Sequence, residues 1–352
     1  MNFASDNTAG IAAPILQAIA DASTGFAGSY GGDRWTAALT ERIAEVFEAD
    51  VAVFPVASGT AANILSMASI ARPWTGILCS HDAHIATDEC GGAEMLTGGA
   101  KLYGVDGRYA KIDPAVLSRR LETWPRGVPH HVQPAAISIT QASEYGAVWT
   151  PDEVAAIGRI ARAHDLRLHM DGARFANAVA ALGCAPADLT WRAGVDILSF
   201  GATKNGAMAA EAVVVFDRAL AEALPFQRMR TGHLLSKGRF LATQLLAYLD
   251  GGLWLELAGH ANAMAARIGA AVEASPGARL AAPVEANEVF AFLTEPADRA
   301  LEDAGCAYHH WTSGIPDPAN SPRQGEVLAR FVASFQTGEE EVRRFAEVLG
   351  AG

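Results

Sequence analysis

The chain carries the stretch Leu198-Ser199-Phe200-Gly201-Ala202-Thr203-Lys204-Asn205-Gly206 a little past its midpoint. The apolar and β-branched run 195–200 predicts a buried strand, and small residues follow it. Lys204 comes just beyond this strand, where burial disfavours the charged form of an amine. The neutral amine attacks carbonyls, so the position suits a Schiff-base lysine, although a surface loop is the commoner place for a single lysine. The other lysines of the chain are Lys101, Lys111 and Lys237.

Two further polar features lie at the ends of predicted strands. Ser58-Gly59-Thr60 joins the predicted strand 51–56 to the predicted helix 61–70. Two hydroxyls, a glycine and the free N–H groups of a helix N-terminus suit a phosphate, although such residues are also ordinary helix caps. Asp171 ends the predicted strand 166–170, where a turn or helix-cap aspartate is the plainer interpretation.

The order of the three features indicates one cofactor. Open α/β sheets bind ligands at the carboxyl ends of their strands, so Ser58-Gly59-Thr60, Asp171 and Lys204 are expected to meet there. Pyridoxal phosphate needs a lysine for the Schiff base, a carboxylate that keeps the pyridine nitrogen protonated, and a cradle for its 5′-phosphate. Each feature is weak alone, but together they predict a pyridoxal 5′-phosphate site.

Strands and helices alternate from residue 51 to about residue 216, which predicts an α/β sheet that is mostly parallel. Beyond it, long helices are expected at 232–250 and 253–274. The remaining expectations are short strands at 288–292 and 327–334, helices at 297–304 and 339–349, and capping boxes at Thr150/Glu153 and Thr337/Glu340. The sequence therefore predicts a large domain over 1–250, including an N-terminal arm, and a smaller C-terminal α+β domain over 251–352.

Composition excludes several classes of partner. The formal net charge of −12 argues against nucleic acid and anionic membranes. No basic and apolar leader is visible at the N-terminus, and no apolar run is long enough to span a bilayer. The cysteines are scattered without metal-ligand spacing, so reduced thiols in a cytoplasmic protein are expected and no metal site is predicted. The cysteines are Cys79, Cys90, Cys184 and Cys306.

A wider set of residues points to one family. These residues are Ser5-Asp6, Tyr30-Gly31, Asp33, Ser58-Gly59-Thr60, Asn63, His84, Glu89, Gly91-Gly92, Asp171-Gly172-Ala173-Arg174, Asn177, 199–204, Asn287 and Arg330. With them the chain resembles the low-specificity L-threonine aldolases, in the aspartate-aminotransferase-like (fold type I) superfamily of pyridoxal-phosphate enzymes. The runs 140–146 and 232–237 resemble the branch that includes phenylserine aldolases. The resemblance implies the aspartate-aminotransferase-like fold and an assembly as a homodimer or homotetramer.

The resemblance also implies roles for individual residues. His84 resembles the histidine that stacks on the cofactor ring and lies near the substrate hydroxyl, although a packed loop histidine is the plainer interpretation of the residue alone. Arg174 and Arg330, helped by Ser5, resemble the residues that hold the α-carboxylate, while Arg174 also suits an ion pair on a helix face. Tyr30 is expected to reach a neighbouring subunit's site. The implied cofactor-binding residues are Ser58, Gly59, Thr60, His84, Asp171, Arg174, Thr203 and Lys204, with Lys204, His84 and Asp171 catalytic.

The implied activity is cleavage of L-3-hydroxy-α-amino acids to glycine and an aldehyde. One position departs from the commoner family pattern, because Glu144 stands where many members have a histidine that is thought to contact the substrate hydroxyl. The departure leaves the threo/erythro preference and the identity of the base open. The alternatives are another fold type I enzyme, either a β-eliminating lyase or an aminotransferase, or a non-catalytic protein that binds the cofactor.

Overall fold

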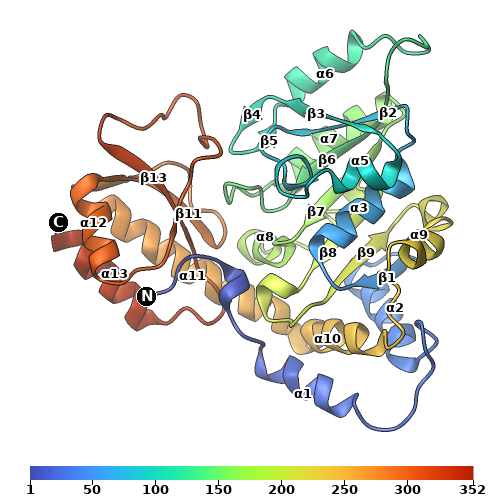
Figure 1. The fold of residues 1–352 in the computed structure, drawn as a ribbon, viewed down its shortest axis with the longest axis horizontal. Coiled ribbons are helices and arrows are strands. Elements are labelled where there is room, and N and C mark those ends of the chain that lie inside the picture. Colours follow the sequence, from blue (N-terminus) through green and yellow to red (C-terminus); the bar gives the residue numbers. More distant parts are fainter. Residues whose placement is uncertain (352) are drawn as a thin grey trace.

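A seven-stranded sheet forms the centre of the larger part of the chain, as the computed structural model shows (Figure 1). The structure describes residues 1–351. The strand order is β1-β9-β8-β7-β6-β2-β3, and only β9 runs antiparallel to its neighbours. The mostly parallel α/β sheet that the sequence predicts is therefore confirmed. The strands are β1 (Ala52–Val56), β2 (Thr75–Ser80), β3 (Lys101–Val105), β6 (Gln133–Thr140), β7 (Arg167–Gly172), β8 (Ile197–Gly201) and β9 (Glu211–Val215).

Helices cover the sheet and connect its strands. The helix α3 is buried along nearly its whole length and packs against β8 and β9, which fits a sequence without charged residues. The helix α7 begins with the predicted capping box, in which the side chains of Thr150 and Glu153 each bond the other's backbone N–H. The helices of this part are α1 (Ala13–Asp21), α2 (Arg34–Phe47), α3 (Gly59–Ile70), α4 (His84–Thr87), α5 (Gly92–Thr97), α6 (Pro114–Glu122), α7 (Pro151–Ala163), α8 (Phe175–Leu182), α9 (Leu224–Arg230) and α10 (Arg239–Leu249). A small hairpin joins β4 (Gly107–Arg108) to β5 (Lys111–Ile112).

A cluster of buried aromatic side chains packs against β8. The ring of Phe200 is fully buried, and its centroid lies 5.9 Å from that of Phe47 and 6.0 Å from that of Trp254. Such edge-to-face pairs contribute about 0.5–1.5 kcal/mol beyond their area burial. Because Phe200 lies four residues before Lys204, this packing fixes the end of β8 and with it the position of the backbone at Lys204.

The C-terminal part is a four-stranded antiparallel sheet with helices on one side (Figure 1). The long helix α11 packs on α8 of the larger part and also on α13 and β11. The first residues of the chain join this part, because Phe3 is buried in its core and Asn2 bridges to Ala307. The division into domains at residue 250 stays a prediction. The elements are α11 (Leu253–Ala274), β10 (Ala278–Leu280), β11 (Glu288–Thr294), α12 (Glu295–Asp303), β12 (His309–His310), β13 (Glu326–Val332) and α13 (Glu339–Ala351).

Two local predictions were wrong. The helix expected at 232–250 begins only at Arg239, since Gly232 has φ 76° and the chain turns before the helix. The capping box expected at Thr337 and Glu340 does not form: Gly338 precedes α13 and has no side chain to accept a hydrogen bond. The carboxylate of Glu341 accepts from Gly338 N, and Thr337 Oγ1 accepts from Ser334 N. Both errors concern element ends, where short-range signals compete.

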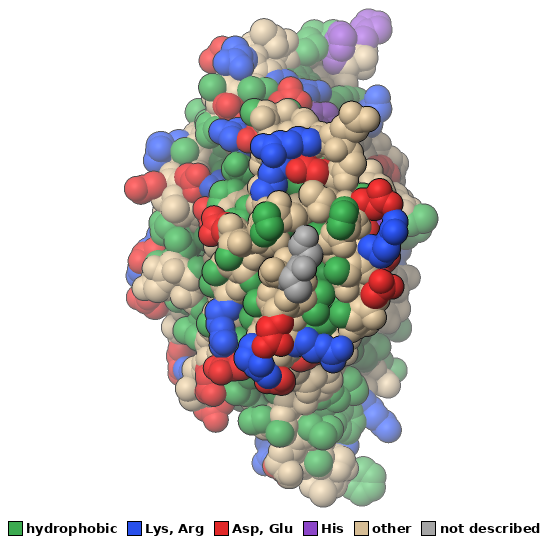
Figure 2. All heavy atoms as spheres, turned by 90° about the vertical axis from the view of Figure 1, so that its left-hand side faces the viewer, with side chains coloured by type: hydrophobic (Ala, Val, Ile, Leu, Met, Phe, Trp, Pro, Cys, Tyr) green, Lys and Arg blue, Asp and Glu red, His purple; other side chains and the backbone are tan. Residues whose placement is uncertain are grey.

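The surface of the C-terminal part mixes both signs of charge. On the face seen in Figure 2, acidic and basic side chains lie among apolar ones around the C-terminal helix. Several of these charges pair along α13, where Arg343 contacts Glu340 and Glu347. Among the described residues, no helix is long and apolar enough to cross a bilayer.

Candidate active site

The predicted cofactor residues come together at the carboxyl end of the parallel strands. A cavity of about 280 Å³ lies there, and all eight of those residues line it: Ser58, Gly59, Thr60, His84, Asp171, Arg174, Thr203 and Lys204. A second cavity of about 410 Å³ shares His84, Arg174 and Lys204 with the first. Ser5 and Arg330 line this second cavity. A larger cavity of about 540 Å³ opens at the opposite end of β7 and β8 and contains none of the predicted residues.

The cradle at the start of α3 has the form that a phosphate requires. Ser58 is the N-cap, and its hydroxyl accepts from Ala61 N at 3.2 Å. A Cβ added to Gly59 would meet no atom within 4 Å, so this backbone faces open space in the cavity. The first N–H groups of the twelve-residue helix α3 therefore point toward a site that an anion can enter.

Asp171 is a buried carboxylate that lacks a cationic partner. It is the penultimate residue of β7 and is 4% exposed. Oδ2 accepts from Asn63 Nδ2 at 2.7 Å and Oδ1 accepts from Ala173 N at 3.0 Å. Both donors are neutral, and among the described residues no cationic nitrogen lies within 4 Å of the carboxylate. A protonated pyridine nitrogen would supply the missing charge, so this residue fits pyridoxal phosphate.

The side chain of His169, close to Asp171 on the same strand, is neutral. His169, two residues earlier on β7, is fully buried, and burial lowers its pKa to about 4. Its ring nitrogens lie 2.9 Å from Ser138 Oγ on β6 and 3.0 Å from Ser199 Oγ on β8. The neutral imidazole therefore links three adjacent strands and brings no competing charge to the carboxylate.

Lys204 lies on a short 3₁₀ turn, η3 (Thr203–Asn205), that one buried carboxylate anchors. Glu211 starts β9, and its carboxylate accepts from Ala202 N at 3.0 Å. The hydroxyl of Thr203 accepts from Ala210 N at 3.1 Å and closes the same loop. Burial raises the pKa of Glu211 to about 7. These contacts hold the loop so that the lysine enters the cavity.

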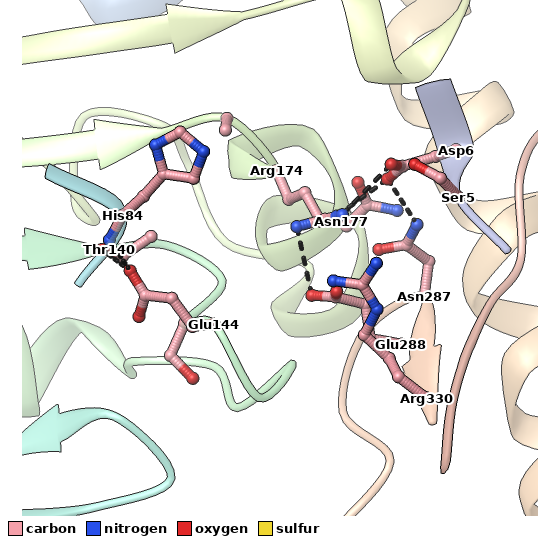
Figure 3. A network of polar contacts seen from close by, with 12 residues as sticks. Ser5, Asp6, His84, Thr140, Glu144, Arg174, Asn177, Asn287, Glu288 and Arg330 are labelled. Carbon is pink, nitrogen blue, oxygen red and sulfur yellow. Dashed lines mark hydrogen bonds and ion pairs between the residues drawn. The ribbon is translucent and has the colours of Figure 1, made fainter. Parts of the chain in front are cut away.

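His84 is held from two sides and is connected to Asp171 through side chains. Its Nδ1 lies 2.9 Å from Glu89 Oε1, and Asn63 Nδ2 donates to Glu89 and to Asp171, both at 2.7 Å. The backbone N of His84 donates to Glu144, which Thr140 also bonds (Figure 3). The hydrogen bond to Glu89 raises the pKa of the imidazole, against the effect of burial. Nδ1 is thereby occupied, which leaves Nε2 for a ligand.

The two arginines differ in how many partners they have. Arg174 donates to Asp6 through Nε at 2.8 Å and Nη2 at 3.1 Å, and its Nη1 lies 3.2 Å from a carboxylate oxygen of Glu288 (Figure 3). Arg330 stacks over the ring of Trp311 at 4.9 Å. Among the described residues no carboxylate lies within 4 Å of the Arg330 guanidinium, and its Nε is buried without a partner. Arg330 is therefore the arginine with free capacity for a ligand.

Comparison with known proteins shows to which family the chain belongs. The beta-eliminating lyase family matches residues 2–296. A low-specificity L-threonine aldolase of Pseudomonas sp. (strain NCIMB 10558) is 41% identical over 99% of this chain and 97% of its own length. A low-specificity L-threonine aldolase of Pseudomonas aeruginosa is also 41% identical, over 99% of this chain and 98% of its own length. The chain belongs to the threonine-aldolase family. A solved threonine aldolase of Leishmania major agrees in fold, with a TM-score of 0.91, 28% identity and coverage of 99% of this chain and 98% of that one.

Membership of the threonine-aldolase family has two direct consequences. The chain is a pyridoxal-phosphate-dependent carbon–carbon lyase, and the fold type I architecture expected from the sequence is confirmed. The cradle and the unpaired carboxylate of Asp171 fit this cofactor independently of the comparison. The roles of individual residues stay predictions.

The structure leaves one predicted residue away from the site and adds two others. Tyr30 is 55% exposed and lines neither cavity, so a role there requires a second subunit. Glu211 and Glu288 line the cavities, although sequence reasoning did not select them. Each is an acidic residue at the start of an apolar strand, and that placement was the available signal.

We predict that Lys204 is the residue that bonds the cofactor. It lies on the same cavity as Asp171, and the scarcity of lysine leaves few competitors. Borohydride reduction of the holoenzyme, followed by peptide mapping, should place the label on Lys204. Label on Lys237 or Lys101 instead would contradict the assignment.

Proposed function

We propose that this chain cleaves L-3-hydroxy-α-amino acids of the threonine, allo-threonine and phenylserine type into glycine and an aldehyde. The proposal rests on three groups that line two adjoining cavities: Lys204, the carboxylate of Asp171 without a cationic partner, and the guanidinium of Arg330. The Nη2 of Arg330 donates to Ala4 O at 3.5 Å, but its Nε has no partner. The names of the full-length relatives support the same reaction class.

The reaction needs a proton acceptor for the β-hydroxyl and a place for an electron pair. When the Cα–Cβ bond breaks, the hydroxyl loses its proton and becomes the carbonyl of the aldehyde. The cofactor, when bound, would supply the electron sink for the pair left on Cα. Cα gains one proton in place of the proton that the hydroxyl loses, so glycine and the aldehyde together contain all the atoms of the substrate. Asp171 balances the charge of the pyridine nitrogen. His84 Nε2 takes the hydroxyl proton, directly or through a water molecule, because Nδ1 is occupied by Glu89.

The α-carboxylate of the substrate binds at Arg330, with Ser5 and Arg174 beside it. A guanidinium recognises a carboxylate with two parallel hydrogen bonds, which fixes the other substituents of Cα. Trp311 supports the Arg330 guanidinium from one face. The residue lies on β13, so the carboxylate is held by the C-terminal part while the cofactor is held by the larger part.

Glu144 replaces the second histidine of many family members, and we propose that it orders His84 rather than the hydroxyl. Its carboxylate accepts from His84 N at 3.0 Å and from Thr140 Oγ1 at 2.7 Å, and burial raises its pKa to about 7. Fewer groups then grip the hydroxyl, so discrimination between the two β-configurations is expected to be loose.

A substrate panel tests the proposed reaction. Threonine, allo-threonine, phenylserine and 3-hydroxyaspartate are incubated with holoenzyme, and both glycine and aldehyde are measured. Equimolar glycine and aldehyde support the proposal. Formation of ammonia and a keto acid would identify a β-eliminating lyase, amino-group transfer to a keto acid would identify an aminotransferase, and absence of any turnover would indicate a non-catalytic protein.

The variant His84→Asn tests the base. We expect the cofactor spectrum to be kept, while cleavage of threonine and allo-threonine falls roughly 10²–10⁴-fold, the usual range for a lost general base. His164→Asn, at the exposed end of α7, is the matched control and should retain full activity. An unchanged rate in His84→Asn would remove this residue from the mechanism.

The pH profile tests the link between His84 and Glu89. A base acts in its neutral form, and Glu89 raises the pKa of His84, so kcat/KM of the wild type should fall as the pH drops through a value above 6.5. Glu89→Gln removes the charge that favours the imidazolium, so this limb should move to lower pH. Glu94→Gln, on α5, should leave the limb where it is. A limb that stays unmoved in Glu89→Gln would contradict the link.

We also propose that the active unit is a homo-oligomer, a dimer or a tetramer. The N-terminal loop carries exposed Phe26 and Tyr30 and is held on the segment before α10 by a hydrogen bond from Tyr30 N to Ser236 O. Exposed Phe226 and Met229 on α9 add further apolar surface. Large exposed apolar side chains are common at subunit interfaces, so we propose that a second copy of the chain covers them.

Sedimentation at micromolar concentration tests the oligomer, with activity measured on the same sample. The expected result is a dimer or tetramer with full activity, and Tyr30→Ala should lower activity without altering the fold of the subunit. A fully active monomer would contradict the proposal.

A further inference from the structure

Glu288 is a buried carboxylate between the two arginines and has no part in the proposed reaction. It is the first residue of β11 and is 1% exposed. One carboxylate oxygen lies 3.2 Å from Arg174 Nη1, and Figure 3 shows the Arg330 guanidinium beside it. Among the described residues neither oxygen has a hydrogen bond, so the group is held by charge alone.

The charges around Glu288 balance before any ligand arrives. Arg174 and Arg330 face it from the N-cap of α8 and from β13, and Asp6 of the 3₁₀ turn η1 (Asp6–Thr8) pairs with Arg174. Two guanidinium groups thus meet two carboxylates. Lys204 on η3 also acts on Glu288, and Asp88 after α4 acts on Arg330. A substrate carboxylate at Arg330 adds one negative charge to this buried group, and an unbalanced buried charge is costly.

Of the two carboxylates, Glu288 is the one that can lose its charge at less cost. Asp6 accepts two hydrogen bonds from Arg174 and one from Asn287 at 3.1 Å. Burial raises the pKa of Asp6, but the charges of Arg174 and Lys204, together with these hydrogen bonds, outweigh burial and lower it. Glu288 has no such bonds, and burial raises its pKa although Arg174 and Arg330 oppose the change. Protonation of Glu288 would also give its free oxygen a hydrogen to donate to the arriving carboxylate.

We propose that Glu288 is a positioning residue of the carboxylate site: it holds the guanidinium groups of Arg174 and Arg330 in the free enzyme and takes up one proton from solvent when an amino-acid carboxylate binds beside them. The inference rests on the proposed function, because it requires the α-carboxylate at Arg330. Binding of the amino acid is then coupled to the pH through a residue that touches no reacting atom.

The test compares two ligands in the wild-type holoenzyme and in Glu288→Gln. Glycine and methylamine both present an amine to the cofactor, but only glycine has a carboxylate. The apparent Kd of each is measured from the cofactor absorbance between about pH 6.5 and 8.5. Uptake of one proton makes Kd rise by up to about tenfold per pH unit. The ratio of the glycine Kd to the methylamine Kd should therefore rise with pH in the wild type and stay flat in Glu288→Gln.

A matched control separates this effect from loss of an ion pair in the same sheet. Glu326 pairs with Arg279 at the other end of β13, away from both cavities, and Glu326→Gln should show the slope of the wild type. His84 is present in all variants and affects the Kd of both ligands, so its titration cancels from the ratio of the two Kd values. If Glu288→Gln fails to retain the cofactor, the wild-type ratio must still rise with pH, and a flat ratio overturns the inference.

A flat ratio in the wild type, or an equal slope in Glu288→Gln, would overturn the inference while cleavage of 3-hydroxy acids remained intact. Failure of glycine to bind, together with absence of cleavage, would instead overturn the proposed function and this inference with it. A slope that is present in the wild type and absent in Glu288→Gln supports both.

Discussion

The buried, unpaired carboxylate of Asp171 is the constraint on which the site depends. Its hydrogen bonds come from an amide side chain and a backbone N–H, and its negative charge has no partner within 4 Å among the described residues. Keeping such a group ionised away from water costs several kcal/mol unless a cation arrives. A cofactor with a protonated ring nitrogen would remove this cost, so we propose that Asp171 favours the form of the cofactor that withdraws electrons best.

Much of the surrounding structure serves to hold that carboxylate and Lys204 at fixed positions. His169 joins β6, β7 and β8 as a neutral group, and Glu211 ties down the loop before the lysine. The aromatic cluster around Phe200 sets the end of β8 from the opposite face. The C-terminal part brings Arg330 to a cavity that His84, Arg174 and Lys204 also line, and we propose that this part holds the substrate carboxylate while the larger part holds the cofactor.

The sequence could predict that Ser58, Asp171 and Lys204 meet, because each lies at the end of a strand. Ser58, Asp171 and Lys204 each follow an apolar run, and parallel strands place their carboxyl ends at one edge. The partners of these residues could not be predicted, since they depend on contacts across the fold: Arg174 meets Asp6 of the N-terminal turn and Glu288 of the C-terminal sheet. The start of α10 was misjudged because the apolar pattern continued across the turn at Gly232.

Cofactor affinity of Asp171→Asn tests this account most directly. Apoenzyme is titrated with pyridoxal 5′-phosphate, and Kd is read from absorbance for the wild type, for Asp171→Asn and for Asp196→Asn, an aspartate at the opposite end of the sheet that bonds Leu168 N. Removing one charge of a buried pair costs about 2–5 kcal/mol. The account predicts a loss of that size in Asp171→Asn, with Asp196→Asn unchanged. Equal affinity in Asp171→Asn and the wild type would contradict it.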